Sequence, residues 1–281
     1  MLHNEFLELD FNPYGGELTS IYRVSENSQQ TWKGDASIWN RSNPVLFPFV
    51  SAIKDNEYIY DGKTYKMAKH GFARDQIFEI TNKNNTSITF TLEENEETLK
   101  IYPFSFKLDI KYILDRNKVI TEYKVTNTHN KEIYFNLGGH PSLMLYGDIT
   151  NNYVEFDKME DLNKFEFSSN SFTGEKVNLC DNVKELPLNY DLFCDDAILL
   201  NELNSKKFYL RNVNNNKYME FEHNFDYFAI WTKDKAPFIC FEPWNSHPDF
   251  INESKHLTEK RNLVKLAPKE VYVKFYSIRV F

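Results

Sequence analysis

Alternation of apolar and polar residues is the feature that most constrains how this 281-residue chain can fold. From Phe106 to Leu114, apolar side chains occupy every second position, as in a strand that buries one face. The polar residues 115–118 predict a turn, and Val119 to Val125 alternates again, so the two segments predict a β-hairpin. The same alternation predicts strands at Ser87 to Leu92 and at Val271 to Val280.

Polar turns and aromatic residues extend this pattern to the rest of the chain. Short clusters rich in Asn, Asp, Lys and Gly, such as 61–63 and 212–216, separate the strand candidates. No window has a sustained helical period with caps, and one short helix is expected between Asp249 and Lys260. The 24 Phe, 17 Tyr and 4 Trp residues favour strands, on whose pleated surface rings pack well. The sequence therefore predicts an all-β fold, a large antiparallel β-sandwich, in a single domain over residues 1–281.

Charge, hydropathy and cysteine content exclude several classes of function. A net charge of -8 leaves no basic surplus for nucleic-acid binding, and no apolar run is long enough to cross a membrane. The first residues lack the basic and apolar regions of a secretory signal. Cys180, Cys194 and Cys240 form an odd set without CxxC spacing, so neither a disulfide framework nor a metal site is expected. These features predict a soluble protein of a reducing cytoplasm.

Three short segments carry the residues suited to acid/base chemistry. They are His70 to Arg74, Gly138 to Pro141 and Phe241 to Trp244, and each sets a histidine or a carboxylate among glycine, proline or aromatic residues. All four tryptophans lie in or beside segments of this kind: Trp32, Trp39, Trp231 and Trp244. Flat apolar faces next to acids and bases suit a sugar ring, which offers C–H faces for stacking and hydroxyls for hydrogen bonds.

His140 and Glu242 are the candidates for the catalytic pair. Two glycines before His140 permit a tight turn or close approach of a ligand, and Pro141 fixes the direction in which the chain leaves. Glu242 lies in an apolar run that predicts a buried strand, where desolvation raises a carboxyl pKa toward the range of a general base. The alternatives are a buried histidine satisfied by a backbone carbonyl and a structural salt bridge between Glu242 and an arginine.

Four further residues are candidates for ligand binding. If the chain is extended from His70 to Arg74, both side chains lie on one side and line one ligand wall. The alternative there is a strand end with an ordinary surface arginine. Arg41 is suited to clamp a hydroxyl or a phosphate, and Asp195 to accept hydrogen bonds from sugar hydroxyls, although both residue types are more often solvated surface charges.

Taken together, the segments resemble the aldose 1-epimerase (galactose mutarotase) family, and most closely its LacX-like branch. The resemblance runs nearly end to end, and the order and spacing of its segments carry it: Gly15 to Leu18, Trp39 to Pro48, His70 to Arg74, Gly138 to Pro141, Trp231 (with Thr232 and Lys233) through Trp244, and Leu257 to Lys260. It implies a sugar cleft on one concave sheet of the sandwich.

The resemblance also implies roles for individual residues. His140 matches the family's general acid and Glu242 its general base, while His70, Arg41, Arg74, Asp195 and Trp244 are expected to bind the sugar. The implied reaction interconverts the α and β anomers of a hexose by ring opening. It needs no cofactor and no metal, because no electron or group leaves the sugar. The expected partner is a small-molecule sugar, and the expected form is a monomer or a homodimer.

Two departures from galactose mutarotase leave the substrate open. His70 is followed at once by Gly-Phe-Ala-Arg, and His140 stands between Gly-Gly and Pro rather than beside an asparagine. Both features also resemble the hexose-6-phosphate epimerase branch, in which arginines matching Arg41 and Arg74 contact phosphate. The low basic content favours an unphosphorylated aldose. A carbohydrate-binding protein without turnover is the remaining alternative, although a pure binder has no need of an acid facing a base.

Overall fold

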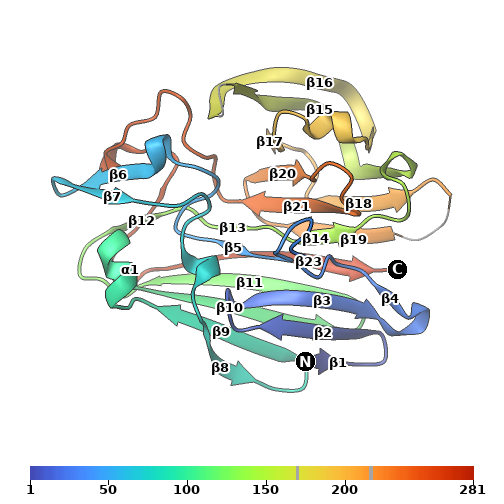
Figure 1. Ribbon diagram of the computed structural model, residues 1–281, viewed down its shortest axis with the longest axis horizontal. Coiled ribbons are helices and arrows are strands. Elements are labelled where there is room, and N and C mark those ends of the chain that lie inside the picture. Colours follow the sequence, from blue (N-terminus) through green and yellow to red (C-terminus); the bar gives the residue numbers. More distant parts are fainter. Residues whose placement is uncertain (169–170, 215–217) are drawn as a thin grey trace.

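The computed structural model describes residues 1–168, 171–214 and 218–281, and strands form most of this described part (Figure 1). Nine described strands form the largest sheet. In chain order they are β8 (Glu79–Lys83), β9 (Ser87–Glu93), β10 (Phe106–Asp115), β11 (Lys118–Asn127), β15 (Asn152–Ser168), β16 (Ser171–Pro187), β18 (Lys207–Asn212), β19 (Tyr218–His223) and β23 (Val271–Val280). They lie in the order β16-β15-β18-β19-β23-β11-β10-β9-β8, and each pairs antiparallel with its neighbours.

A second antiparallel sheet of six described strands packs against the first. It consists of β5 (Val45–Leu46), β13 (Gly138–Gly139), β14 (Ser142–Met144), β17 (Ile198–Asn201), β20 (Tyr227–Trp231) and β21 (Phe238–Trp244). Its order is β17-β20-β21-β13-β5, and β14 pairs with β21. Aromatic rings join the two sheets: Phe208 of β18 stacks on Phe228 of β20, with ring centroids 4.2 Å apart. The predicted all-β antiparallel sandwich is therefore confirmed.

Smaller elements lie around the two main sheets. They are the four-stranded sheet of β1 (Leu2–His3), β2 (Leu7–Asn12), β3 (Glu17–Arg23) and β4 (Ser28–Gln29), the pair β6 (Glu57–Tyr60) and β7 (Lys63–Lys66), the pair β12 (Ile133–Phe135) and β22 (Val264–Leu266), and the helix α1 (Glu96–Ile101).

The hairpin predicted from alternation is formed by β10 and β11. Their register runs without a bulge from the pair Phe106–Asn127 to the pair Asp115–Lys118, and buried residues alternate with less buried ones along β11. Arg116 adopts the left-handed conformation (φ 54°) at the turn. The strands predicted at Ser87 to Leu92 and Val271 to Val280 are also present, as β9 and β23.

The helix prediction was wrong. Between Asp249 and Lys260 the chain forms only a short 3-10 turn, at Leu257–Glu259, whereas the unpredicted α1 spans six residues. A capping box starts α1: the Asn95 side chain accepts from the backbone of Thr98, and the Thr98 hydroxyl accepts from the Asn95 N–H. A helix of six residues is too short to show a hydrophobic period, so the capping box is the local sequence signal that marks where it begins.

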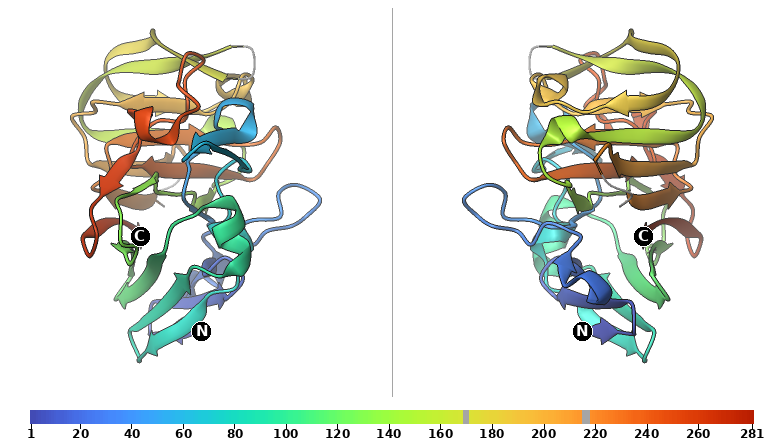
Figure 2. Two further views of the ribbon diagram at one scale, coloured as in Figure 1. Left: turned by 90° about the vertical axis from the view of Figure 1, so that its left-hand side faces the viewer. Right: turned by 90° about the vertical axis from the view of Figure 1, so that its right-hand side faces the viewer.

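The long β15–β16 hairpin leaves the plane of its sheet and arches over β17 and β20 (Figures 1 and 2). Several register shifts between its two strands allow the bend, because a bulge increases the local curvature of a strand pair. Phe165 and Phe172 of the hairpin join a small apolar cluster with Leu199 of β17 and Trp244 of β21. The hairpin therefore covers part of the outer face of the six-stranded sheet.

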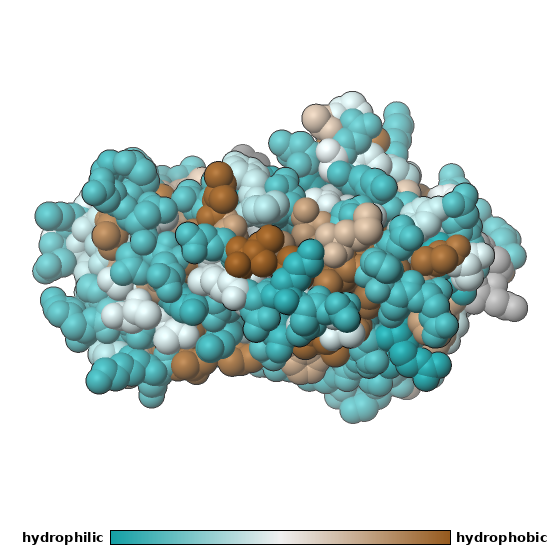
Figure 3. Space-filling view, turned by 90° about the horizontal axis from the view of Figure 1, so that it is seen from below, coloured by the Kyte–Doolittle hydropathy of each residue, from teal (hydrophilic) through white to brown (hydrophobic). Residues whose placement is uncertain are grey.

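The face turned downward in Figure 1 is mostly polar, with apolar residues interspersed in small groups (Figure 3). In the described part of the chain, no helix has the length and apolar character needed to cross a membrane.

Candidate active site

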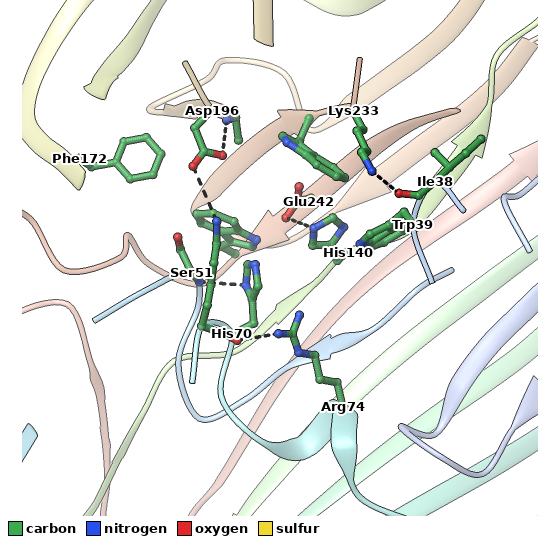
Figure 4. Close-up of a pocket in the computed structure, with 14 residues that line it drawn as sticks. Ile38, Trp39, Ser51, His70, Arg74, His140, Phe172, Asp196, Lys233 and Glu242 are labelled. Atoms are coloured by element: carbon green, nitrogen blue, oxygen red, sulfur yellow. Dashed lines mark hydrogen bonds and ion pairs between the residues drawn. The ribbon is translucent and has the colours of Figure 1, made fainter. Parts of the chain in front are cut away.

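A pocket of about 330 Å³ opens on the outer face of the six-stranded sheet (Figure 4). The strands of the sheet supply its floor, and loops together with the β15–β16 hairpin supply its walls. Its lining residues are Ile38, Trp39, Ser51, Lys69, His70, Arg74, His140, Phe172, Asp196, Ala197, Trp231, Lys233, Glu242 and Trp244. The pocket thus brings together five of the seven residues predicted for the site: His140, Glu242, His70, Arg74 and Trp244.

The alternation of side chains along β21 places Glu242 on the pocket side of the sheet. Ile239 and Phe241 point into the main core between the sheets, so Glu242 and Trp244 point the other way. Ala229 is the residue of β20 paired with Glu242, and its side chain is a single methyl group. A strand that is apolar on both faces therefore carries one carboxylate at the base of the pocket.

The two glycines before His140 are required by packing. Gly138 pairs with Trp244 and Leu46, and a Cβ there would lie 2.7 Å from Cδ1 of the Trp244 indole. A Cβ on Gly139 would lie 2.9 Å from the ring of Tyr276. These close approaches let β13 run beside β21 and bring His140 alongside Glu242.

His140 and Glu242 are in direct contact. Nε2 of His140 lies 3.2 Å from Oε2 of Glu242, and both side chains are buried. Trp39 and Trp231 flank the imidazole, with ring centroids 5.0 and 5.7 Å from it. The partner of Glu242 is therefore a histidine at a pocket and not an arginine in a structural salt bridge.

Burial sets the protonation of this pair. Loss of hydration raises the pKa of Glu242 well above its usual range and lowers the pKa of His140 to about 3. Both shifts favour the uncharged forms, a protonated Glu242 and a neutral His140, whose Oε2 and Nε2 atoms lie 3.2 Å apart.

His70 is fixed in one tautomer by Ser51. The backbone N–H of Ser51 donates to ring atom Nδ1 of His70 over 3.0 Å. In return, the backbone N–H of His70 donates to the Ser51 carbonyl over 2.7 Å. Burial, together with His140 and Arg74, lowers the His70 pKa well below its ordinary value, so the ring is neutral. Since Nδ1 accepts, the ring proton resides on Nε2, which leaves His70 as a hydrogen-bond donor.

The extended conformation predicted from His70 to Arg74 was wrong. His70 and Gly71 are left-handed (φ 70° and 73°), and the chain then forms a 3-10 turn from Ala73 to Asp75. Phe72 packs in the main core, while His70 and Arg74 reach the pocket. A Cβ on Gly71 would lie only 2.1 Å from the Phe47 carbonyl oxygen, so this long-range contact dictates the local backbone.

The two arginines have different surroundings. Arg74 lines the pocket, and its Nη2 donates to the Lys69 carbonyl over 2.8 Å. Arg41 lies outside the pocket lining: one of its nitrogens donates to the Arg74 carbonyl over 2.7 Å, and another pairs with the carboxylate of Asp75. Arg41 thus contacts the segment that carries Arg74.

Asp195 was predicted to bind the sugar, but its neighbour Asp196 is the residue that faces the pocket. Asp195 is exposed and outside the lining, whereas Asp196 is part of it. Asp196 accepts from the Ala197 N–H and lies 3.7 Å from the ammonium of Lys69. An ion pair between two loops therefore lies at one end of the pocket (Figure 4).

The wall that carries Trp39 is anchored from behind by a buried carboxylate. Oε1 of Glu17 accepts from the backbone N–H groups of Ser42 and Asn43, each over 2.6 Å. From the other side, the Lys233 ammonium donates to the Ile38 carbonyl over 2.6 Å. These contacts hold the loop that places the Trp39 ring beside the His140 imidazole.

Sequence analysis missed several lining residues, among them Ser51, Lys69, Phe172 and Lys233. Two of them lay beside or within segments already singled out in the sequence: Lys69 directly precedes His70, and Lys233 lies in the segment that begins at Trp231. In the described residues, no group of three or more His, Cys, Asp and Glu side chains is placed to hold a metal ion, and Cys180, Cys194 and Cys240 are free thiols.

Known proteins resemble this chain in both sequence and fold. A family model described as aldose 1-epimerase matches residues 1–279. The chromosomal LacX protein of Lactococcus lactis subsp. lactis is 30% identical, over 99% of this chain and 98% of its own. A galactose mutarotase related enzyme from Lactobacillus acidophilus superposes with a TM-score of 0.95 at 28% identity, covering 100% of this chain and 96% of its own. A galactose mutarotase-like protein from Lactobacillus casei superposes with a TM-score of 0.93 at 27% sequence identity. The match covers 100% of this chain and 99% of that protein.

Proposed function

The chain belongs to the aldose 1-epimerase family, and on that premise we propose that it interconverts the α and β anomers of an unphosphorylated aldohexose. The observation that carries the proposal is the contact between His140 and Glu242, 3.2 Å apart at the base of a pocket walled by tryptophans. Opening a sugar ring requires one group to remove a proton while another supplies one, and a pair that holds one proton provides both.

In the proposed reaction Glu242 removes the proton of the anomeric hydroxyl while His140 protonates the ring oxygen. The bond between C1 and the ring oxygen then breaks and gives the open aldehyde. Rotation about the C1–C2 bond, followed by the reverse transfers, closes the other anomer. Burial favours the proton on Glu242 in the empty site, and a sugar hydroxyl that donates to this carboxylate favours its ionised form. Binding therefore moves the proton toward His140, as the reaction requires.

The remaining lining residues support a neutral sugar. His70 offers its Nε2–H to a hydroxyl, and Trp39, Trp231 and Trp244 offer flat apolar surface. Of the two arginines expected to hold a phosphate, Arg41 is occupied by Asp75 and by a carbonyl outside the pocket. Lys69 is partly balanced by Asp196. This arrangement favours an unphosphorylated aldose over the hexose 6-phosphate that remains the alternative substrate.

Polarimetry of freshly dissolved α-glucose, α-galactose and glucose 6-phosphate tests the proposal. The purified protein should accelerate the approach to the equilibrium rotation for at least one free hexose. The buffer alone and heat-denatured protein are the controls, because mutarotation also proceeds without an enzyme. If no aldose in a broad panel is accelerated although sugar binding is measurable, the protein is a carbohydrate-binding module and not an isomerase.

A further inference from the structure

Lys260 ends the segment Leu257 to Lys260, one of those that carry the family resemblance, and it lies outside the candidate pocket. Its side chain is fully buried, and its ammonium pairs with the carboxylate of Asp249, which is 2% exposed. Two charges removed from water in this way add little net stability, because the lost hydration offsets their attraction. What the pair contributes is therefore found in the other groups that the Asp249 carboxylate holds.

The Asp249 carboxylate holds the end of the loop that follows β5. Its Oδ2 accepts from the backbone N–H of Lys54 over 3.0 Å, at the start of the short 3-10 turn Lys54–Asn56. Its Oδ1 accepts from the side-chain amide of Asn262 over 3.4 Å. The ammonium of Lys260 compensates the charge of the carboxylate, so both hydrogen bonds persist in a buried place. The pair thus joins the chain after β21 to this loop.

Ser51 lies three residues before Lys54 in the same loop and orients His70 (Figure 4). Its backbone N–H donates to Nδ1 of His70, and its carbonyl accepts from the backbone N–H of His70. Ser51 itself is left-handed (φ 51°), a conformation that a serine keeps only where its surroundings impose it. Ser51 therefore holds the imidazole only as long as the loop itself is held.

The loop is anchored on both sides of Ser51. On one side the Pro48 carbonyl accepts from the backbone N–H of Asn136 over 2.6 Å. On the other side Lys54 reaches the chain after β21 twice, through its N–H to Asp249 and through its ammonium to the Ile251 carbonyl over 3.2 Å. Water competes for the exposed ammonium, so the bond to the buried carboxylate is the firmer of the two.

The orientation of His70 matters because its ring lies among the residues of the proposed reaction. Its centroid lies 5.6 Å from that of His140 and 6.4 Å from that of Trp244. With Nδ1 bound to Ser51, Nε2–H is the donor left for a sugar hydroxyl. A shift of the loop by about 1 Å would misplace this donor and weaken its hydrogen bond to the sugar.

We propose that the Asp249–Lys260 pair is a positioning element of the active site, which fixes the loop around Ser51 and thereby the orientation and tautomer of His70. Neither residue of the pair lines the candidate pocket, so both act through the loop. The kinetic consequence rests on the proposed function, whereas the state of the His70 ring does not.

Lys54→Pro tests the link between the pair and the loop. It removes the N–H that donates to Asp249 and leaves the ion pair in place. Proline fits this position, because Lys54 begins a 3-10 turn and Ile53 before it is extended (φ -103°, ψ 159°). Lys54→Ala is the matched control, since it removes the same exposed side chain and keeps the N–H. Lys54→Pro should raise the hexose KM about three- to tenfold with little change in kcat, and Lys54→Ala should change neither.

Nitrogen NMR of the His70 ring supplies a readout that a merely structural role would not move. In the wild type Nδ1 accepts and Nε2 carries the proton, so the two nitrogens should give the well-separated signals of a single tautomer. In Lys54→Pro the two signals should move toward each other, because a ring that has lost its Ser51 donor exchanges between tautomers. His70→Asn identifies the signals by their loss.

A second pair of variants tests the ion pair itself. Asp249→Asn with Lys260→Met removes both charges but keeps an oxygen that accepts from Lys54. Asp249→Leu with Lys260→Met removes the acceptor as well. Uncharged replacements of a buried ion pair are often tolerated, so both combinations are expected to fold. The first should keep the wild-type KM and His70 signals, whereas the second should change both as Lys54→Pro does.

A wild-type KM with wild-type His70 signals in folded Lys54→Pro would overturn the inference. Equal losses in all four variants, with the His70 signals unchanged, would also overturn it, because they would reflect general loosening of the fold. If the combination with Asp249→Leu does not fold, the two Lys54 variants decide, since their change lies at an exposed turn. If the wild type turns over no sugar, the proposed function fails, and the His70 signals still show whether the pair sets the ring.

Discussion

Removing the buried Glu17 carboxylate should both destabilise the protein and displace the wall that carries Trp39. Its Oε1 accepts two hydrogen bonds of 2.6 Å from the Ser42 and Asn43 backbone, and the residue is buried. Glu17→Ala leaves two buried N–H groups without their acceptor, at about 1–3 kcal/mol each. We therefore expect the free energy of unfolding to fall by about 2–6 kcal/mol.

Glu17→Gln is the matched control, because its amide oxygen can accept both bonds. Burial raises the pKa of Glu17, so the ionised carboxylate is itself disfavoured in the folded protein. The neutral amide avoids that cost while it weakens the two bonds, and we expect a net change within about 1 kcal/mol. Urea unfolding measures both variants, and the sugar KM reports the position of Trp39.

An Ala variant as stable as the Gln variant would refute this account of Glu17. It would show that water or a rearranged loop satisfies the two N–H groups at no cost. A large loss of stability without any change in sugar KM would refute the second part, the link between this anchor and the Trp39 wall.

Three other changes test separate parts of the account. Gly71→Ala should destabilise the protein by more than about 1–2 kcal/mol and weaken sugar binding, because a Cβ at this left-handed position would lie 2.1 Å from the Phe47 carbonyl oxygen. Chemical unfolding measures the loss of stability, and the sugar KM measures the loss of binding. Burial lowers the pKa of His223 from 6.5 to about 3, so the stability this residue contributes is present above pH 6.5 and decreases as the pH falls. Between pH 7 and 5 this loss amounts to about 2 kcal/mol, and denaturation curves of His223→Phe should lack it. Rates with glucose and glucose 6-phosphate at several ionic strengths should favour the neutral sugar; a phosphate preference that fades with salt and is lost in Arg74→Ala would identify the other substrate.

The fold was predictable from sequence wherever a local period reports burial. In β10 and β11 every second side chain enters the core, so the hairpin and its neighbours β9 and β23 followed directly from alternation. The helix α1 did not, because six residues give no period and its cap depends on two side chains. The short 3-10 turn after Asp249 likewise gave no periodic signal that distinguishes it from a helix.

Site residues were predictable from sequence where a polar or charged residue differs in character from the residues around it in the chain. Glu242 in an apolar strand and His140 after two glycines are such residues, and the structure brings the two together. Ser51 and Phe172 are ordinary in their segments and reach the pocket only through the packing of distant strands. The backbone at His70 is likewise set by Phe47, more than twenty residues earlier in the chain.

The most direct test of the central claim is the rate of anomer exchange in Glu242→Gln. Saturation-transfer NMR measures that rate at equilibrium, with the hexose that the wild type turns over fastest. Because Gln is nearly isosteric and cannot take the anomeric proton, exchange should fall by about 10²–10⁴-fold while the sugar still binds. An exchange rate within a few-fold of the wild-type value in a folded, sugar-binding Glu242→Gln variant would contradict proton transfer through the His140–Glu242 pair.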